Sequence, residues 1–529
     1  MVKLMGAFDW FFYLLRSMSW VCVLCVVSAC SSLPQKIDKP PSYAYTDTQN
    51  TKLGKAVKPL VQNKESKTGF LPLGSGVNAF TARYVLSNLA ERSIDAQYYI
   101  WHDDMTGKLL VHALLEAADR GVRVRLLLDD INMAGKDNAL ITLHAHPNIE
   151  VRLFNPFVNR SFRAMDVITD FSRINRRMHN KSFTFDNQVT IVGGRNIGDE
   201  YFDANPSTDI QDFDLLAIGD VVNEVSNQFD KYWNSKFAFP VDSLVSKAEE
   251  DTAGALKKRL DQHVMQAGNT VYVDAVKQSQ LLAHLKDKTL SFFWSHAQVL
   301  YDEPEKIELD EDDTSTHLRS RLDPLVADTR QEIIIISPYF IPGDDGVERM
   351  SAANARGVKV SVLTNSLAST DVPLVYSGYS PYRVPLLKAG VDLYEMKATY
   401  KSTQKVKLMD VSSRASLHSK VYIFDRQHLF VGSYNLDPRS TKINTEMGIY
   451  ITNAELAERF AEWWENSVGK LAYKLELEFP DGKPDRESRL VWLDLTQDPV
   501  VRYEDEPKVD AWDKFKNSFF SVFPIEGQL

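Results

Sequence analysis

The chain contains the same short pattern at two places. HxKx4Dx6GxxN spans residues 179–196 and again residues 418–435. At average residue frequencies, one such match arises by chance in about one of 10⁴ chains of this length. Two matches, with His179 and His418 standing 239 positions apart, therefore indicate an internal duplication and a fold built from two similar halves.

Each copy of the motif belongs to a matching order of predicted elements. Alternating apolar residues predict strands, apolar residues at helical spacing predict a helix, and a glycine ends that helix. This order predicts an α/β fold of two pseudo-symmetric lobes, each a mostly parallel or mixed sheet flanked by helices, with the functional site between them. The elements are expected at 93–100, 108–120, 122–128 and 149–154, and their counterparts at 332–337, 346–356, 358–363 and 391–394.

The repeat also sets the expected domain boundaries. We expect the first lobe at 70–240, a connecting segment at 241–331 and the second lobe at 332–529, which ends in an apolar tail. The connecting segment includes the acidic run 302–313. A dense run of carboxylates is usually a solvated loop, and we expect one here.

Strand geometry brings the chemical groups of each motif together. Residues i and i+2 of a strand point to the same face, so His179 projects beside Lys181. The glycine that follows lets the returning backbone approach, and Asn196 can then donate to an anion. The second half repeats this set with His418, Lys420 and Asn435. Two facing halves would supply two imidazoles, two ammonium groups and two amides, which suits a phosphodiester.

On these motifs the chain resembles the phospholipase D superfamily. Its flanking sequences at 97–104, 192–202 and 432–440 are similar to those of bacterial C-type cardiolipin synthases. The resemblance covers the chain from about residue 70 to its end. One departure is Gly194, which stands where the family often has serine, whereas Ser433 keeps it. A hydroxyl contact to phosphate is therefore expected in the second half only.

The resemblance implies a covalent phosphohistidine. One histidine attacks phosphorus, and the other protonates the leaving alcohol and then deprotonates the incoming one. Family precedent gives the attack to His179 and the acid–base role to His418, with the reverse assignment left open. The resemblance also implies that the phosphate is held by Lys181, Lys420, Asn196 and Asn435, and that Asp186 and Asp425 have supporting structural roles.

A catalytic histidine also needs a carboxylate to orient it. In the second half the candidate is Glu446, which follows His418 by 28 residues, where related enzymes place such a group. In the first half the candidates are Asp212 and Asp214, and counting back from Gly219 favours Asp212. The alternative for either aspartate is a surface carboxylate without this role.

The body of the chain is acidic and contains no cysteine. The net charge is −10, and the three cysteines all lie in the first thirty residues. This charge argues against a protein that follows nucleic-acid backbones. A body without thiolates must use oxygen and nitrogen groups for its chemistry. Because the motif lysines supply the positive charge that a divalent ion supplies elsewhere, we expect no metal and no cofactor.

The N-terminus resembles a bacterial export signal. Residues 17–29 form an uncharged run of 13 residues after Arg16, which is short for a membrane span of about 20. Residues 27–30 resemble a lipobox in which Cys30 would be lipidated, with 1–30 as signal peptide and 31–69 as a tether. An uncleaved signal anchor is the alternative. We expect a periplasm-facing lipoprotein of the cell envelope, at the inner or the outer membrane.

Two segments are candidates for contact with a membrane surface. Residues 163–177 carry apolar residues at helical spacing among arginines, which suits anionic lipid. The run 512–523 is strongly apolar on one face. For both segments, a helix packed on the core is an equal alternative.

The expected function is phosphatidyl transfer. The resemblance implies a phospholipid donor, with phosphatidylethanolamine one candidate, and phosphatidylglycerol as the acceptor, so that cardiolipin is the product. A hydrolytic phospholipase D and a phosphodiester nuclease are the enzyme alternatives. A non-catalytic envelope scaffold is disfavoured because both motifs are intact.

Overall fold

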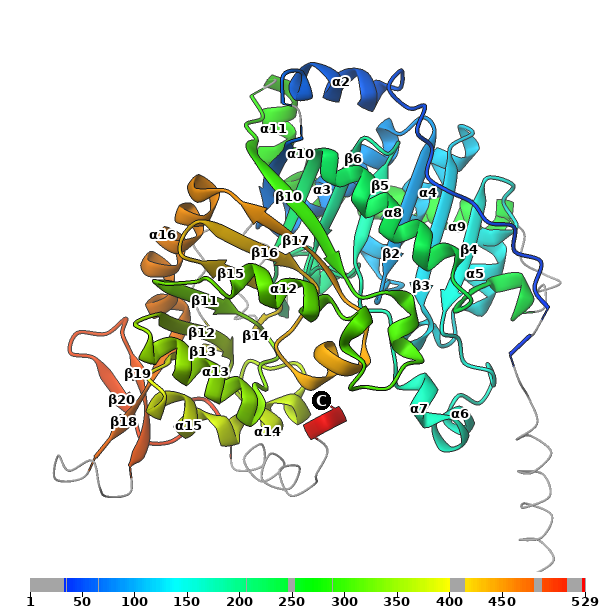
Figure 1. Ribbon diagram of the computed structural model, residues 1–529. Helices are drawn as coiled ribbons and strands as arrows, with labels where there is room; N and C mark the ends of the chain where they lie inside the picture. The colour runs from blue at the N-terminus through cyan, green and yellow to red at the C-terminus, as the bar shows by residue number, and fades with distance from the viewer. Residues whose placement is uncertain are drawn as a thin grey trace, which may run out of the picture.

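The computed structural model describes residues 33–34, 36–64, 66–205, 207–245, 253–287, 289–399, 414–479, 488–510 and 526–528. One sheet of 18 strands runs through both halves, with helices packed on it (Figure 1). The predicted α/β fold with two repeated lobes is therefore confirmed. The predictions for Cys30 and for the apolar run 512–523 lie outside the described residues.

The first half of the sheet has the strand order β9–β4–β3–β2–β5–β6–β8–β1. Strands β2, β3 and β4 are parallel, and the other pairs are antiparallel. The sheet is therefore mixed. Its strands are β1 (Thr68–Leu73), β2 (Ser93–Tyr98), β3 (Arg123–Asp129), β4 (Ile149–Phe154), β5 (Ser182–Phe185), β6 (Val189–Gly193), β8 (Asp214–Gly219) and β9 (Ala238–Pro240).

The second half repeats this order as β18–β13–β12–β11–β15–β16–β17–β10, and β19 and β20 extend its β18 edge. Here β11, β12 and β13 are the parallel strands. The strands are β10 (Phe293–Tyr301), β11 (Glu332–Ile336), β12 (Lys359–Asn365), β13 (Asp392–Met396), β15 (Val421–Phe424), β16 (His428–Gly432), β17 (Met447–Thr452), β18 (Ala472–Glu478), β19 (Arg489–Asp494) and β20 (Val501–Tyr503).

Strand β10 joins the two halves, although it lies in the segment that was expected only to connect them. Its first three residues pair with β1, and the rest pairs with β17. A buried apolar cluster that includes Phe70, Leu215 and Ile449 packs across this junction. The two lobes therefore share one sheet and part of one core.

The helix that follows the first parallel strand of each half ends as the sequence predicts. Helix α4 (Met105–Asp119) is capped at its start by Asp104, whose side chain accepts from the Gly107 N–H. Gly121 and Gly357 come just after α4 and α13 (Gly343–Ala355), with φ of 92° and 88°. A side chain is strained at such an angle, so glycine is the residue that ends each helix.

Two short cross-lobe pairings lead directly into the motif histidines. Strand β7 (Thr208–Gln211) pairs in parallel with β14 (Arg414–Leu417), and Met178 forms an equivalent bridge with Thr445. Beyond these pairings, the His418 N–H donates to the Gln211 carbonyl and the His179 N–H to the Thr445 carbonyl, each at 2.8 Å. Each histidine is therefore held by the backbone of the other half.

Part of the range expected to be a tether lies on the first lobe. Lys39 Nζ donates to the carbonyls of Ser235 and Ala238, and the Ala44 N–H donates to Asp230. Helix α2 (Lys52–Val61) follows, with Leu53 and Val57 buried. The described residues of 36–61 therefore contribute to the body of the fold.

The prediction that the acidic run 302–313 is a solvated loop is wrong for some of its first residues. Asp302 and Lys306 are buried and form an ion pair at 3.1 Å, and Ile307 is buried with them. Asp310, Asp312 and Asp313 are exposed, as expected. Part of the first half of the run packs inside the protein because Asp302 contacts a buried cation and accepts hydrogen bonds from backbone N–H groups there, whereas Glu305 is exposed.

The segment 163–177 is two short helices, not one amphipathic helix. Helices α6 (Ala164–Thr169) and α7 (Phe171–Ile174) project from the lower edge of the molecule in Figure 1. The arginines expected to face lipid bind protein groups instead: Arg163 contacts Asp130 at 3.0 Å and Arg173 contacts Asp170 at 2.5 Å. The large side chains that remain exposed on this segment, Val167, Ile168 and Phe171, are apolar.

Candidate active site

The two motif histidines are buried, and each contacts a carboxylate from the other half. His179 Nδ1 lies 2.8 Å from Glu446 Oε2, and His418 Nδ1 lies 2.6 Å from Asp212 Oδ2. Asp214 is not at this position, because it binds Arg83 at 2.9 Å in a buried ion pair. The carboxylates are thus those that the sequence favoured, but each serves the histidine of the opposite lobe.

The departure at Gly194 has a steric cause. A Cβ at Gly194 would lie 2.2 Å from Asp212 Oδ1, well inside van der Waals contact. In the second half, Ser433 occupies the equivalent place, and its hydroxyl donates to Glu446 Oε2 at 2.5 Å. Glycine therefore leaves room for Asp212, whereas serine binds Glu446. The contact predicted between Ser433 and phosphate would require this bond to break.

The lysines and two tyrosines surround the histidines. Lys181 Nζ donates to the His179 carbonyl at 2.6 Å and lies 5.4 Å from the ring centre of Tyr99. The Tyr99 ring meets the His179 ring edge-on at 5.0 Å. In the second half, Lys420 Nζ and the His418 ring lie 5.9 and 6.2 Å from the Tyr339 ring centre.

The remaining predicted residues lie in two groups. Asn196 and Asn435 are buried; Asn196 donates to the Tyr201 hydroxyl, and Asn435 Oδ1 has no hydrogen-bond partner among the described residues. Asp186 accepts from the backbone N–H of Arg92 at 2.7 Å, and Asp425 accepts from that of Gln331 at 2.7 Å. These aspartates tie each motif strand to the loop before the first parallel strand of its half.

Burial sets the electrostatics of the histidine–carboxylate pairs. It lowers the pKa of His179 well below its usual value, and Lys181 lowers it further. Burial also raises the pKa of Glu446 to about 7. Burial alone would raise the pKa of Asp212, but His418, together with the charges of Lys420 and Arg195, brings that pKa below its usual value. The pKa of His418 is lowered by burial and by Lys420, while Asp212 opposes the shift.

The pKa of each motif lysine is also lower than that of a lysine in water. Burial lowers the pKa of Lys420 to about 8 and that of Lys181 well below its usual value. The charge of Lys420 lowers the pKa of Lys181 as well. Two cations enclosed in one site create a strong attraction for an anion, which would restore both charges.

A buried ion pair stands behind Glu446. Asp302 Oδ2 accepts from the Glu446 N–H at 2.7 Å, and Lys306 Nζ donates to the Ser440 carbonyl at 2.9 Å. The Ser440 hydroxyl in turn donates to Glu446 Oε1 at 2.8 Å. The Asp302–Lys306 pair therefore fixes both the backbone and the carboxylate of Glu446.

Sequence reasoning missed these supporting residues. Tyr99 and Tyr339 each stand shortly after the first parallel strand of their half, β2 and β11, so a tyrosine at the end of each strand was the usable signal, although the two positions differ by one residue in the repeat. Asp302 and Lys306 gave a weaker one, a lysine four residues after an aspartate in an acidic run. Only folding shows that this pair is buried.

Two groups among the described residues have the donors for a metal ion. They are His102 with Asp104 and Glu200, and His112 with Glu116 and Asp261. Neither group contains a motif residue. The pair Asp129 and Asp130 is occupied by arginines, with Arg177 at 3.1 Å from Asp129 and Arg163 at 3.0 Å from Asp130.

Comparisons with known proteins agree with the duplicated fold and the paired motifs. The family described as "Cardiolipin synthase, PLD-like domain" matches residues 86–233 and 323–468. Cardiolipin synthase C of Escherichia coli (strain K12) is 42% identical over 482 residues, which is 90% of this chain and 100% of that protein. A cardiolipin synthase of Geobacillus kaustophilus is 27% identical, over 72% of this chain and 62% of its own length.

A solved structure supports the fold alone. The phosphatidylserine synthase of Haemophilus influenzae Rd KW20 aligns with a TM-score of 0.52 at 13% identity, over 81% of this chain and 95% of that chain. The family match covers both halves and includes both histidine motifs, and the E. coli relative covers nearly the whole chain. The chain therefore belongs to the phospholipase D superfamily, as a member of its cardiolipin synthase family.

Proposed function

We infer that the protein is a phosphatidyltransferase that makes cardiolipin from a phospholipid donor and phosphatidylglycerol. The observation that carries this inference is the pair of buried histidines, each held by a carboxylate of the opposite lobe and flanked by a lysine. The relatives named as cardiolipin synthases supply the substrate class. Phosphatidylethanolamine is a further candidate donor.

In the proposed mechanism His179 is the nucleophile. Its Nδ1 is bound to Glu446, which leaves Nε2 for attack on phosphorus. Its pKa lies well below the usual value, so the imidazole is neutral and carries the lone pair that attack requires. As the bond from Nε2 to phosphorus forms, the bond from phosphorus to the donor's alcohol oxygen breaks, and a phosphohistidine results.

His418 then moves the protons. Its partner Asp212 has a lowered pKa and stays ionised, which favours the imidazolium form of His418 when the substrate's negative charge enters. His418 gives its proton to the leaving alcohol and later takes one from the acceptor hydroxyl, whose oxygen attacks phosphorus and releases His179. Lys181 and Lys420, with Asn196 and Asn435, stabilise the charge on the phosphoryl oxygens.

Lipid mass spectrometry tests this function and separates the alternatives. Wild-type protein incubated with phosphatidylglycerol vesicles should form cardiolipin, whereas a hydrolase would form phosphatidic acid. His179→Ala and His418→Ala should each remove nearly all turnover while the melting temperature stays close to that of the wild type. Turnover should also survive EDTA. Substantial turnover in either folded variant would contradict the paired-histidine mechanism, and cleavage of nucleic acid but not lipid would favour a nuclease.

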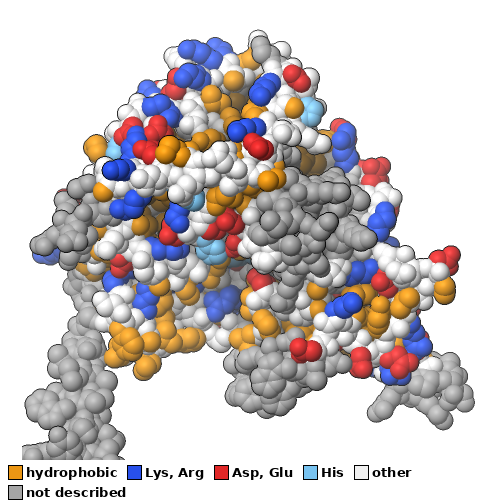
Figure 2. Space-filling model, turned by 180° about the vertical axis from the view of Figure 1, so that it is seen from behind, with side chains coloured by type: hydrophobic (Ala, Val, Ile, Leu, Met, Phe, Trp, Pro, Cys, Tyr) orange, Lys and Arg blue, Asp and Glu red, His pale blue; other side chains and the backbone are white. Residues whose placement is uncertain are grey.

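The apolar surface of α6 and α7 supports contact with a membrane surface. Phe162, Val167, Ile168 and Phe171 are exposed there, Ile168 by 79%, and they form the apolar patch at the lower left in Figure 2. This patch lies at residues 162–171, a short distance before His179 in the chain. Exposed apolar clusters of this kind mark membrane or protein contacts.

The location we propose is the cell envelope, with Cys30 lipidated. Among the residues that the structure describes, no helix has both the length and the apolar composition that a membrane span requires. The lipobox-like residues 27–30 support a lipoprotein. Cys30→Ser should leave a heavier, unprocessed precursor without acyl label. A peptide from before Cys30 in the mature protein would contradict this and favour a signal anchor.

A further inference from the structure

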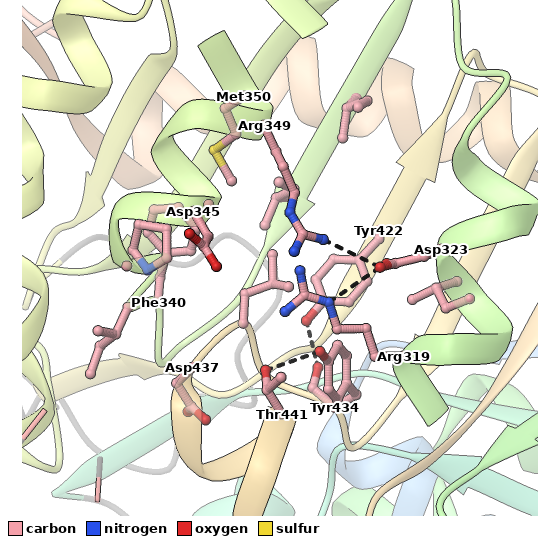
Figure 3. Close-up of a pocket in the computed structure, with 18 of the residues that line it drawn as sticks. Arg319, Asp323, Phe340, Asp345, Arg349, Met350, Tyr422, Tyr434, Asp437 and Thr441 are labelled. Carbon is pink, nitrogen blue, oxygen red and sulfur yellow. Dashed lines mark hydrogen bonds and ion pairs between the residues drawn. The ribbon is translucent and has the colours of Figure 1, made fainter. Parts of the chain in front are cut away.

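The second lobe contains a cavity that the paired-histidine site does not use. It has a volume of about 410 Å³, within the range of roughly 300–1,000 Å³ that small-molecule sites occupy. It lies between α12 (Leu318–Val326), α13 and the face of the sheet formed by β11, β12 and β15 (Figure 3). Its walls are mostly apolar and include Leu322, Ile335, Phe340, Met350, Val360 and Phe424.

The duplication shows why this cavity exists. Helices α3 (Gly76–Leu89) and α4 flank the first parallel strand of the first half, and they pack against each other. Their counterparts α12 and α13 flank β11 but stand apart, joined at the surface by an ion pair between Asp323 and Arg349 at 3.3 Å. Helix α12 has 9 residues against 14 for α3, so it leaves part of the sheet face uncovered.

The mouth of the cavity carries an unequal distribution of charge. Arg319 and Arg349 lie on either side of Asp323, at 3.4 and 3.3 Å, so two guanidinium groups share one carboxylate. Figure 3 places these three residues together and Asp345 on the opposite side of the cavity. Guanidinium groups bind phosphate through paired hydrogen bonds. The arginine side of the mouth therefore suits an anionic phosphate, and the cavity beneath it suits a hydrocarbon chain.

We propose that this cavity is a second lipid site, which takes one acyl chain of an anionic membrane phospholipid while Arg319 and Arg349 hold its phosphate. That such lipids reach the protein rests on the proposed function. The occupant would touch Tyr434 and Leu436, which flank Asn435 in the loop of the paired-histidine site. The Tyr434 hydroxyl also contacts Thr441 at 3.2 Å, further along the same loop. A bound chain would therefore stabilise the loop that carries this amide.

Photolabelling of the full chain tests the site. The probe is phosphatidylglycerol with a diazirine at the end of one acyl chain, carried in phosphatidylcholine vesicles. After irradiation, peptides that contain Met350, Phe424 and Leu436 should carry the label. Ala353→Phe fills the cavity, since Ala353 is buried in its wall, and should reduce this labelling at least fivefold. Ala352→Phe on the exposed side of the same helix is the matched control and should label as the wild type does.

Several outcomes would overturn the proposal. No label on these peptides in the wild type, or equal label in Ala353→Phe and Ala352→Phe, would exclude a chain in the cavity. If Ala353→Phe does not fold, Met350→Trp fills the same space. Arg319→Gln combined with Arg349→Gln should reduce labelling by the phospholipid but not by a diazirine fatty alcohol, which has no phosphate. An equal effect on both probes would exclude the phosphate contact.

The labelling does not depend on turnover, so it separates this proposal from the proposed function. His179→Ala should be labelled as strongly as the wild type. If the wild type forms no cardiolipin yet labels the cavity, the proposed function fails and the lipid site stands. If cardiolipin forms and the cavity stays unlabelled, the reverse holds.

Discussion

Replacing Gly194 with alanine should separate Asp212 from His418. The new Cβ would lie 2.2 Å from Asp212 Oδ1, whereas ordinary contact begins near 3.4 Å, so the carboxylate must retreat by about 1 Å. Asp212 has little freedom to do so, because Oδ2 contacts His418 at 2.6 Å and Oδ1 accepts from the Phe213 N–H at 2.7 Å. The retreat would therefore lengthen the contact that orients the imidazole.

The expected effect is large for activity and modest for stability. A misplacement of about 1 Å in a catalytic group can cost on the order of 10²-fold in rate, and overpacking a buried position costs about 1–3 kcal/mol. Because Asp212 raises the pKa of His418, its retreat should lower that pKa and, since His418 acts as the general acid in the first step, move the alkaline limb of the pH–rate profile to lower pH. Cardiolipin formation from vesicles, followed across pH, measures both the loss of rate and the shift of the pH–rate profile.

Gly74→Ala is the matched control. A Cβ there would meet only the Phe213 ring, at 3.9 Å, so turnover and pH profile should stay close to those of the wild type. If Gly194→Ala keeps turnover within twofold of the wild type and an unaltered pH profile, the argument that glycine makes room for Asp212 is refuted.

Three further predictions concern stability and the membrane. Burial raises the pKa of Glu446 to about 7 from 4.5, so the stability that its protonated form contributes is complete below pH 4.5 and lost as pH rises through 7. The free energy of unfolding of Glu446→Gln in urea, relative to that of the wild type, should therefore rise by roughly 3 kcal/mol between pH 4 and pH 9, and the variant should lose activity. If the difference between the two proteins does not change with pH, the raised pKa is contradicted. Lys306→Met leaves the Asp302 carboxylate buried without its cation and should lower the free energy of unfolding by about 3–5 kcal/mol in the same assay. No loss of stability would contradict a structural role for this ion pair. Ile168→Ser with Phe171→Ser should reduce turnover on vesicles but not on monomeric short-chain phosphatidylglycerol, with the exposed Met265→Ser as control; an equal loss on both substrates would indicate a structural defect instead.

Much of the fold was predictable from local patterns. The strand–helix–strand order and the glycines after the helices are local features, since alternation, helical spacing and a positive φ depend on residues close in the chain. Gly121 and Gly357 therefore end their helices where the sequence predicted. The motif residues are an exception: His179 and Lys181 were expected in a strand, but β5 begins only at Ser182, and β15 begins only at Val421, after His418 and Lys420.

The sequence by itself determined the duplicated motif, the residue types of the site and the family to which the chain belongs, because the same residue types recur at the same spacing in both halves. Only the tertiary structure decided which carboxylate meets which histidine. Glu446 reaches His179 and Asp212 reaches His418 because short backbone pairings cross between the lobes. The burial of Asp302 and Lys306 behind Glu446 was decided there too. Such contacts join residues more than a hundred positions apart, and their partners are determined by how the two lobes pack against each other, which no local sequence pattern encodes.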